Sequence, residues 1–136
     1  MSEILARCTW LSGGDPNTFA MISRPEIESL PVWDIVSQVM DRYLPTKTVG
    51  KMICLSRMTP GQVIEPHIDR HDAKCPHRIH VPLQTNESVV FVEEKTALHM
   101  RVGHAYEINP TKQHSVVNGG TTDRVHLFWN AVDKNS

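Results

Sequence analysis

Four polar residues in the second half of the chain carry the pattern with the clearest chemical meaning. His67 and Asp69 are separated by one residue, His114 follows far downstream, and Arg124 comes shortly after it. Residues at alternate positions of a β-strand point to the same side, so His114 can complete a three-ligand face with His67 and Asp69. Two imidazoles and one carboxylate, with the other coordination positions open, suit non-haem Fe(II). Arg124 can hold a co-substrate carboxylate, because a guanidinium binds two oxygens at once.

Composition narrows the classes of protein to consider. The 136 residues fit one domain spanning 1–136, and a net charge of -1 gives no reason to expect a nucleic-acid partner or a membrane surface. Three sparse cysteines favour a reducing, cytoplasmic setting. The start of the chain lacks the pattern of a secretory signal, and no apolar run approaches the roughly 20 residues of a membrane span.

The hydrophobic pattern predicts one helix followed by many short strands. Residues 32–43 place apolar side chains at helical spacing, and Pro45 helps to end the helix. Turn residues then separate short alternating or apolar runs. Strands are predicted at residues 4–11, 51–58, 62–69, 78–81, 88–92, 97–102, 105–108, 115–117 and 124–132. This series predicts a mainly β fold of the jelly-roll or cupin-like type, with one or two flanking helices.

The last two predicted strands test whether His114 and Arg124 share a face. If they form a hairpin with a three-residue loop at 119–121, His114 pairs with His126 and Val116 pairs with Arg124. That register turns His114 and Arg124 inward, whereas a two-residue loop would separate them. A glycine of this loop, which begins Gly119-Gly120, can supply the positive φ that such loops need. The metal-site hypothesis therefore predicts an odd loop.

Six motifs occur in an order that resembles the aspartyl/asparaginyl beta-hydroxylase-like enzymes, including the bacterial proline hydroxylases. The resemblance covers roughly residues 50–132. The motifs are His67-Ile68-Asp69, Arg78-Ile79-His80-Val81-Pro82-Leu83, Met100-Arg101-Val102-Gly103, Glu107-Ile108-Asn109, His114-Ser115-Val116-Val117-Asn118 and Arg124-Val125-His126-Leu127.

The resemblance implies a double-stranded β-helix that carries an Fe(II)- and 2-oxoglutarate-dependent dioxygenase site. The iron ligands and catalytic residues would be His67, Asp69 and His114. Oxidative decarboxylation of 2-oxoglutarate with O2 would be coupled to hydroxylation of an amino acid or an Asp/Asn-type side chain.

The same resemblance implies the residues that bind the co-substrate. Arg124 would hold the distal carboxylate of 2-oxoglutarate, and Ser56 would assist it. Arg78 and His80 match a pair near the metal-bound end of the co-substrate.

Several alternatives stay open at this stage. His71 is a competing metal ligand, Cys75-Pro76-His77 lacks the second pair that a zinc finger needs, and His126 is a candidate neighbour of the site. The protein could instead be a metal-binding cupin with 2-oxoglutarate-independent chemistry, or a non-enzymatic ligand-binding jelly roll. The pattern does not distinguish a small-molecule substrate from a peptide, and homodimerisation to close the site stays open.

Overall fold

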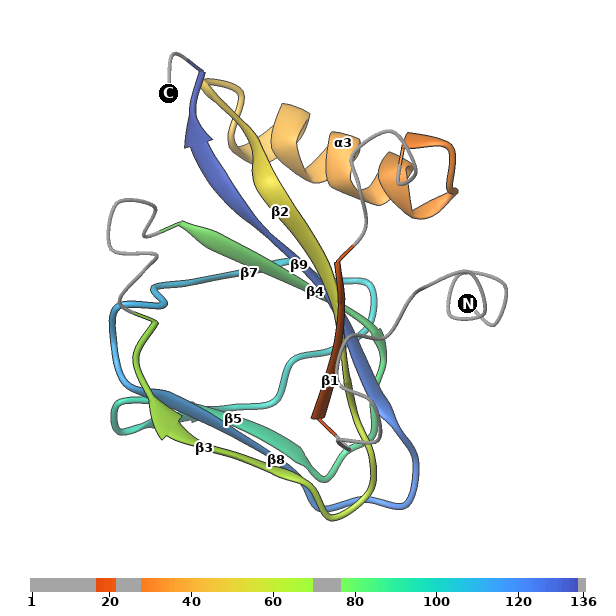
Figure 1. The fold of residues 1–136 in the computed structure, drawn as a ribbon, viewed down its shortest axis with the longest axis vertical. Coiled ribbons are helices and arrows are strands. Elements are labelled where there is room, and N and C mark those ends of the chain that lie inside the picture. Colours follow the sequence, from red (N-terminus) through yellow and green to blue (C-terminus); the bar gives the residue numbers. More distant parts are fainter. Residues whose placement is uncertain (1–16, 22–27, 70–76, 135–136) are drawn as a thin grey trace.

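The part of the chain that the structure describes forms two facing antiparallel β-sheets, with helix α3 (Val32–Tyr43) on the outside of the larger sheet (Figure 1). The computed structural model describes residues 17–21, 28–69 and 77–134. Its elements are β1 (Asn17–Met21), α3 (Val32–Tyr43), β2 (Lys47–Met58), β3 (Val63–His67), β4 (Arg78–Gln84), β5 (Val89–Glu93), β6 (Thr96–Leu98), β7 (Tyr106–Ile108), β8 (His114–Asn118) and β9 (Arg124–Asp133). This arrangement is a jelly roll, as the sequence predicts.

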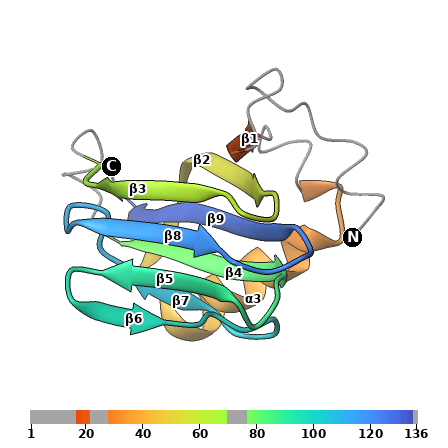
Figure 2. The ribbon, with the colours of Figure 1, turned by 90° about the horizontal axis from the view of Figure 1, so that it is seen from below.

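The two sheets contain strands that are far apart in the chain. The larger sheet has the order β1-β2-β9-β4-β7, and the smaller sheet has the order β3-β8-β5-β6. Figure 2 shows the smaller sheet in front of the larger one. Most strands that follow each other in sequence, such as β8 and β9, lie in opposite sheets. The two sheets face each other and contribute side chains to one shared interior.

Helix α3 forms where the sequence predicts it and packs on the outer face of the larger sheet. Val32, Val36 and Met40 are buried, as their helical spacing requires. Trp129 is fully buried in the same apolar cluster, and its indole N–H points at the sulfur of Met40 at 3.2 Å. No helix within the described ranges is long and apolar enough to cross a membrane.

Strand β9 separates apolar and polar side chains onto its two faces, because successive residues of a strand point in opposite directions. The outer face contributes Val125, Leu127, Trp129 and Ala131 to the apolar cluster under α3. The alternate residues, which are also buried, are Arg124, His126, Phe128 and Asn130. The functional residues of the larger sheet therefore project into the space between the sheets.

The predicted hairpin between the last two strands is wrong. Strand β8 pairs with β3 and β5, whereas β9 pairs with β2 and β4, so His114 does not pair with His126. Asn118 redirects the chain, since its side chain donates to the carbonyl of Thr122 at 2.9 Å and accepts from the backbone N–H of Gly120 at 3.1 Å. Neither Gly119 nor Gly120 has the positive φ that the predicted loop would need. His114 and Arg124 are both buried, but they come from opposite sheets.

Other predicted boundaries differ more modestly from the structure. Strand β3 ends at His67 rather than continuing to Asp69, and β2 begins at Lys47 rather than at residue 51. Strand β1, which pairs with β2 at the edge of the larger sheet, was not predicted. The strand predicted at residues 4–11 lies outside the described ranges.

Candidate metal centre

A β-bulge in β3 brings His67 into the interior. Ile64 pairs with Val116 and His67 pairs with His114, so β3 uses one more residue than β8 over this interval. Regular alternation from Ile64 would turn His67 to the opposite face, and the extra residue restores its inward orientation. Pro66 lies within the bulge, where the missing N–H of a proline is tolerated. The sequence predicted the shared face of His67 and His114 but not the bulge that produces it.

His67, Asp69 and His114 come together as a candidate metal-binding group. A side-chain nitrogen of each histidine and a carboxylate oxygen of Asp69 all lie within 4.8 Å of one another. The Nε2 atom of His67 lies 3.5 Å from Oδ1 of Asp69, and the Nε2 atom of His114 lies 3.4 Å from Oδ2. The competing ligand His71 lies outside the described ranges.

The hydrogen bonds of the two histidines fit metal binding through Nε2. Nδ1–H of His67 donates to the carbonyl of Glu65 at 2.7 Å, and Nδ1–H of His114 donates to the carbonyl of Lys112 at 2.8 Å. Metal-binding histidines usually donate their other ring N–H in this way, which fixes the ring and its tautomer. Both imidazoles can therefore present the lone pair of Nε2 toward the carboxylate of Asp69.

Asp69 follows the end of β3 and is anchored by its backbone. Its N–H donates to the carbonyl of Pro110 at 2.8 Å, whereas the sequence predicted that the strand continues through Asp69. The hydrogen bond with His114 lowers the pKa of Asp69 to about 2, against the opposing effect of burial and with help from Arg78. Burial lowers the pKa of His114, but its contacts with Asp69 and the Lys112 carbonyl outweigh that effect and raise it. The carboxylate therefore stays ionised, and the main proton to displace on metal binding is that of His114.

Arg124 forms a second polar centre in the interior. Its side chain is 1% exposed, and its Nη1 donates to Oγ of Ser56 at 3.1 Å. Burial lowers the pKa of Arg124 to about 9, so the guanidinium still carries its charge near neutral pH. Within the described ranges, no carboxylate forms an ion pair with it and its Nε–H has no partner. A buried cation without an acid is suited to receive an anionic ligand.

The hydrogen bond from Arg124 fixes the tautomer of one further histidine, and a second histidine lies beside it. Arginine can only donate, so Nη2 of Arg124 donates to Nδ1 of His126 at 3.0 Å. Nδ1 of His80 lies 3.1 Å from the same atom, whose single lone pair already accepts from Arg124. Burial holds the pKa of both histidines well below the ordinary value, with the charge of Arg124 adding to the effect. His126, which the sequence identified as a neighbour, thus contacts both Arg124 and His80.

Arg78 contacts the candidate metal centre directly. Its Nη1 donates to Oδ2 of Asp69 at 2.8 Å, and its Nε donates to the side-chain oxygen of Asn130 at 3.0 Å. The guanidinium also lies over the ring of Phe128, 5.3 Å from its centroid. The described site residues that the sequence predicted therefore form two centres, which Phe128 connects because its ring lies against Arg78 and stacks on His80.

Three aromatic and amide residues of the site were missed in the sequence. Phe128 stacks on His80 with centroids 5.0 Å apart, Phe91 stacks on His114 at 6.0 Å, and Asn130 holds Arg78. Two of them could have been predicted from the alternation within residues 124–132. Phe128 and Asn130 lie on the same face of that strand as Arg124 and His126.

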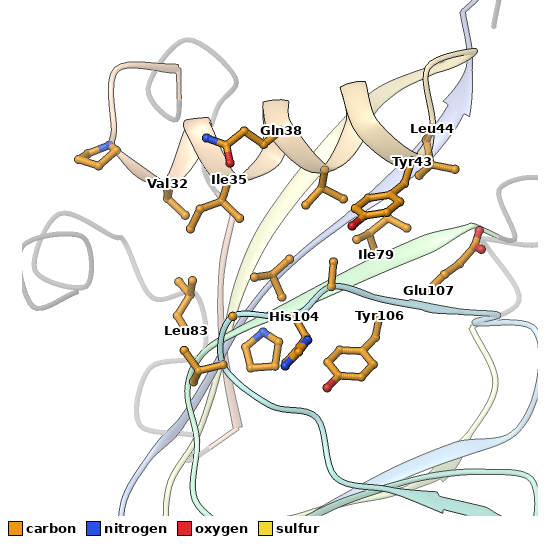
Figure 3. A pocket seen from close by; sticks show the side chains of 17 residues that line it. Val32, Ile35, Gln38, Tyr43, Leu44, Ile79, Leu83, His104, Tyr106 and Glu107 are labelled. Atoms are coloured by element: carbon orange, nitrogen blue, oxygen red, sulfur yellow. The ribbon is translucent and has the colours of Figure 1, made fainter.

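The large groove on the outside of the protein is separate from both polar centres. It has a volume of about 850 Å³ and lies between α3 and the outer side of β4 and β7. Ile35 and Tyr43 of α3 line one wall, and Ile79 of β4 lies on the opposite wall with His104 and Tyr106 (Figure 3). None of His67, Asp69, His114 or Arg124 contributes to it.

Solved structures of similar fold include both oxygenases and other cupins. An oxidoreductase of the 2OG-Fe(II) oxygenase family from Burkholderia pseudomallei has a TM-score of 0.69 at 12% identity, covering 96% of this chain and 75% of its own. The Cnp3 cupin domain of Schizosaccharomyces pombe has a TM-score of 0.60 at 12% identity, covering 96% and 73%. A predicted oxalate decarboxylase from Thermotoga maritima has a TM-score of 0.54 at 14% identity, covering 93% and 95%. At these identities the likeness shows the fold alone.

The family comparison is more specific than the fold comparison. No curated protein sequence matches the chain significantly. The model of the aspartyl/asparaginyl beta-hydroxylase family, however, matches residues 20–134, which include every candidate ligand and co-substrate residue named above. The chain therefore belongs to the aspartyl/asparaginyl beta-hydroxylase family.

Proposed function

We propose that this protein is an Fe(II)- and 2-oxoglutarate-dependent hydroxylase. Family membership supports a hydroxylase-type role. Dependence on Fe(II) and 2-oxoglutarate is supported by two complementary polar centres between the sheets. One offers two imidazoles and a carboxylate to a metal, and the other offers a buried guanidinium without an acidic partner to an anion.

In this proposal the metal centre binds iron through Nε2 of His67, Nε2 of His114 and the carboxylate of Asp69. These three residues leave other coordination positions of the metal open, as oxygen-using iron sites require. Iron with its co-substrate would supply the activation of O2 that converts a substrate C–H bond into C–OH, with 2-oxoglutarate decarboxylated to succinate and CO2.

The second centre would bind the far end of 2-oxoglutarate. Arg124 keeps N–H groups available after its bonds to Ser56 and His126, because the guanidinium has five donors. Charge-assisted, two-point hydrogen bonds to a carboxylate would then orient the co-substrate along the interior. Burial of Arg124 excludes competing water, which strengthens this interaction.

The substrate would approach from the side of β3. His67 is 39% exposed, whereas His114 and Arg124 are buried, so the metal centre is most open beside His67. Family membership suggests a free amino acid or an Asp/Asn-type side chain as the substrate class. We propose hydroxylation of one of these.

An anaerobic titration tests the proposal. Fe(II) and then 2-oxoglutarate are added to purified protein while the visible metal-to-ligand charge-transfer band is followed. We expect a band in the wild type and in the control variant His104→Ala, whose residue is exposed in the outer groove. His114→Ala should lose the band, because it loses a ligand.

Two other results would contradict parts of the proposal. Iron binding without a band on addition of 2-oxoglutarate would favour a cupin whose metal serves 2-oxoglutarate-independent chemistry. Failure of folded wild-type protein to bind iron would reject the metal centre itself. Where a band forms, succinate production during a screen of amino acids and Asp- or Asn-containing peptides identifies the substrate.

A further inference from the structure

Arg78 is held in place by strand β9 and directed at the carboxylate of Asp69. The residue is 6% exposed and lies directly opposite Asn130 in the pairing of β4 with β9. Asn130 accepts the hydrogen bond from Nε, and Phe128 lies under the guanidinium plane. These contacts fix a side chain that would otherwise have many rotamers, so its Nη1 reaches Oδ2 of Asp69 at 2.8 Å.

This contact makes the two oxygens of Asp69 unequal. Oδ2 receives the charge-assisted hydrogen bond from Arg78 and lies 3.4 Å from Nε2 of His114. Oδ1 lies 3.5 Å from Nε2 of His67, and no arginine of the described ranges donates to it. A carboxylate with one oxygen engaged in this way favours binding a metal through the other oxygen alone.

We infer that Arg78, anchored by Asn130 and Phe128, is a positioning residue that holds Asp69 as a one-oxygen ligand of the metal centre. The inference rests on the proposed function only for the identity of the metal. One-oxygen binding keeps a coordination position that a two-oxygen carboxylate would occupy, and an oxygenase needs that position for its co-substrate or O2. The sequence resemblance implies that Arg78 lies near the co-substrate, and the structure shows that it contacts the ligand carboxylate.

Metal affinity measured without 2-oxoglutarate separates these two roles. A residue that orients Asp69 affects metal binding before any co-substrate is present, whereas a residue that binds only the co-substrate does not. We would titrate Co(II), as a coloured substitute for Fe(II), into wild-type protein and into Arg78→Met, Arg78→Lys and Asn130→Leu. Arg42→Met, on the exposed side of α3, is the matched control for loss of an arginine.

We expect Arg78→Met to weaken Co(II) binding by roughly 10- to 100-fold, the usual cost of losing a group that orients a metal ligand. Arg78→Lys should recover only part of this affinity, because lysine cannot bond Asp69 and Asn130 with one planar fork. Asn130→Leu should show a smaller loss, and Arg42→Met none. Far-ultraviolet circular dichroism identifies variants that do not fold, and Arg78→Lys keeps the test valid if Arg78→Met is among them.

Rescue by formate provides a second readout that a merely structural role would not affect. Asp69→Gly removes the ligand carboxylate and leaves space where formate can supply one. If Arg78 holds that carboxylate, formate should restore Co(II) binding in Asp69→Gly but not in the double variant Asp69→Gly/Arg78→Met. Equal rescue of both variants, or wild-type Co(II) affinity in folded Arg78→Met, would overturn the inference.

These measurements distinguish failure of the positioning role of Arg78 from failure of the proposed hydroxylase function. If 2-oxoglutarate never produces its charge-transfer band but Arg78→Met still weakens Co(II) binding, the positioning role stands and the co-substrate assignment fails. If the band forms and Arg78→Met changes only the affinity for 2-oxoglutarate, the proposed function stands and the inference fails. A folded wild-type protein that binds no Co(II) would overturn both.

Discussion

The two faces of β9 carry buried side chains of opposite polarity, because alternate residues of the strand point in opposite directions. On the outer face, Val125, Leu127 and Trp129 are fully buried beneath α3 in an apolar cluster. On the inner face, Arg124 and His126 are equally buried but polar. Equal burial therefore has opposite thermodynamic meaning on the two faces, since burial of apolar area stabilises the fold and burial of a charged group opposes it.

This difference indicates that the outer face of β9 stabilises the fold and that the inner face serves ligand binding. The interior could be filled with apolar side chains, yet Arg124 and His126 retain donors without partners in the described ranges. Such donors are costly unless a ligand satisfies them. We therefore expect outer-face changes to alter the free energy of unfolding with little effect on ligand affinity, and inner-face changes to do the reverse.

The largest effect on stability should follow removal of Trp129. We predict that Trp129→Ala lowers the free energy of unfolding by about 3–5 kcal/mol, because it deletes a buried aromatic ring and leaves a cavity. Urea denaturation measures this change. Co(II) affinity under conditions where the variant is folded should stay within about 2-fold of wild type, in keeping with the ~0.5 kcal/mol by which distant sites usually interact. A large loss of metal affinity in the folded variant would show that the two faces are coupled.

Arg124 should give the reverse result. We predict that Arg124→Met weakens 2-oxoglutarate binding by at least about 30-fold, from the ~2–5 kcal/mol typical of truncating a buried, hydrogen-bonded charge pair. Iron affinity should be nearly unchanged, because Arg124 does not belong to the candidate metal centre. Stability should not fall, because the variant replaces a desolvated cation with an apolar side chain of similar length.

Two measurements on Arg124→Met check that prediction. The charge-transfer band reports the affinity for 2-oxoglutarate, and thermal unfolding reports stability. Marked destabilisation would mean that Arg124 supports the fold through Ser56 and His126, and the contrast between the two faces of β9 would then fail.

The fold was predictable from the sequence where the hydrophobic pattern is local. The spacing of Val32, Val36 and Met40 predicts α3 with the observed bounds, and short alternating runs predict most strands of the jelly roll. The pairing of β8 and β9 was not predictable by the same argument. Loop length alone favoured a hairpin, whereas the side-chain hydrogen bonds of Asn118 and the competing partners β3 and β5 carry the chain across to the other sheet.

The candidate site was predictable in its residue types and less so in its contacts. His67, Asp69, His114 and Arg124 were identified because their residue types and their order along the chain match metal-ligand and carboxylate-binding chemistry. The bulge at Pro66 could not be derived from alternation, which predicts the wrong face for His67 relative to Ile64. The partner of Arg78 also depends on three-dimensional packing, since Asp69, Phe128 and Asn130 converge on it from separate parts of the chain.

The pH dependence of the metal centre should separate metal affinity from stability. The pKa of His114 is raised above its ordinary value of 6.5, so Co(II) must displace a proton from it over the neutral range. We predict that Co(II) affinity falls by up to about 10-fold for each pH unit below that raised pKa, as expected when binding displaces one proton. Isothermal titration between about pH 6 and 8 measures the slope expected from this linkage.

Stability of the metal-stripped protein should show the opposite trend. A group with a raised pKa in the folded state contributes stability below its unfolded pKa and loses that contribution as pH rises through the folded value. The metal-stripped protein should therefore become slightly less stable as pH rises past the raised pKa of His114, while Co(II) affinity increases. Asp69→Asn should flatten the stability trend, because it removes the negative charge that favours protonated His114. An unchanged trend in Asp69→Asn would show that another group titrates.

Ser56 should give the smallest effect and the finest test of the inner face. Its hydroxyl accepts one hydrogen bond from Arg124, and a single such bond is worth about 0.5–1.5 kcal/mol, so we predict that Ser56→Ala weakens 2-oxoglutarate binding by about 2- to 10-fold. Cys54→Ala is the matched control, since Cys54 lies on the same buried face of β2 but opposite Phe128 rather than opposite His126. The charge-transfer titration should separate the two variants even if both lose similar stability. Equal weakening in Cys54→Ala would mean that packing of β2, rather than the hydroxyl of Ser56, sets the position of Arg124.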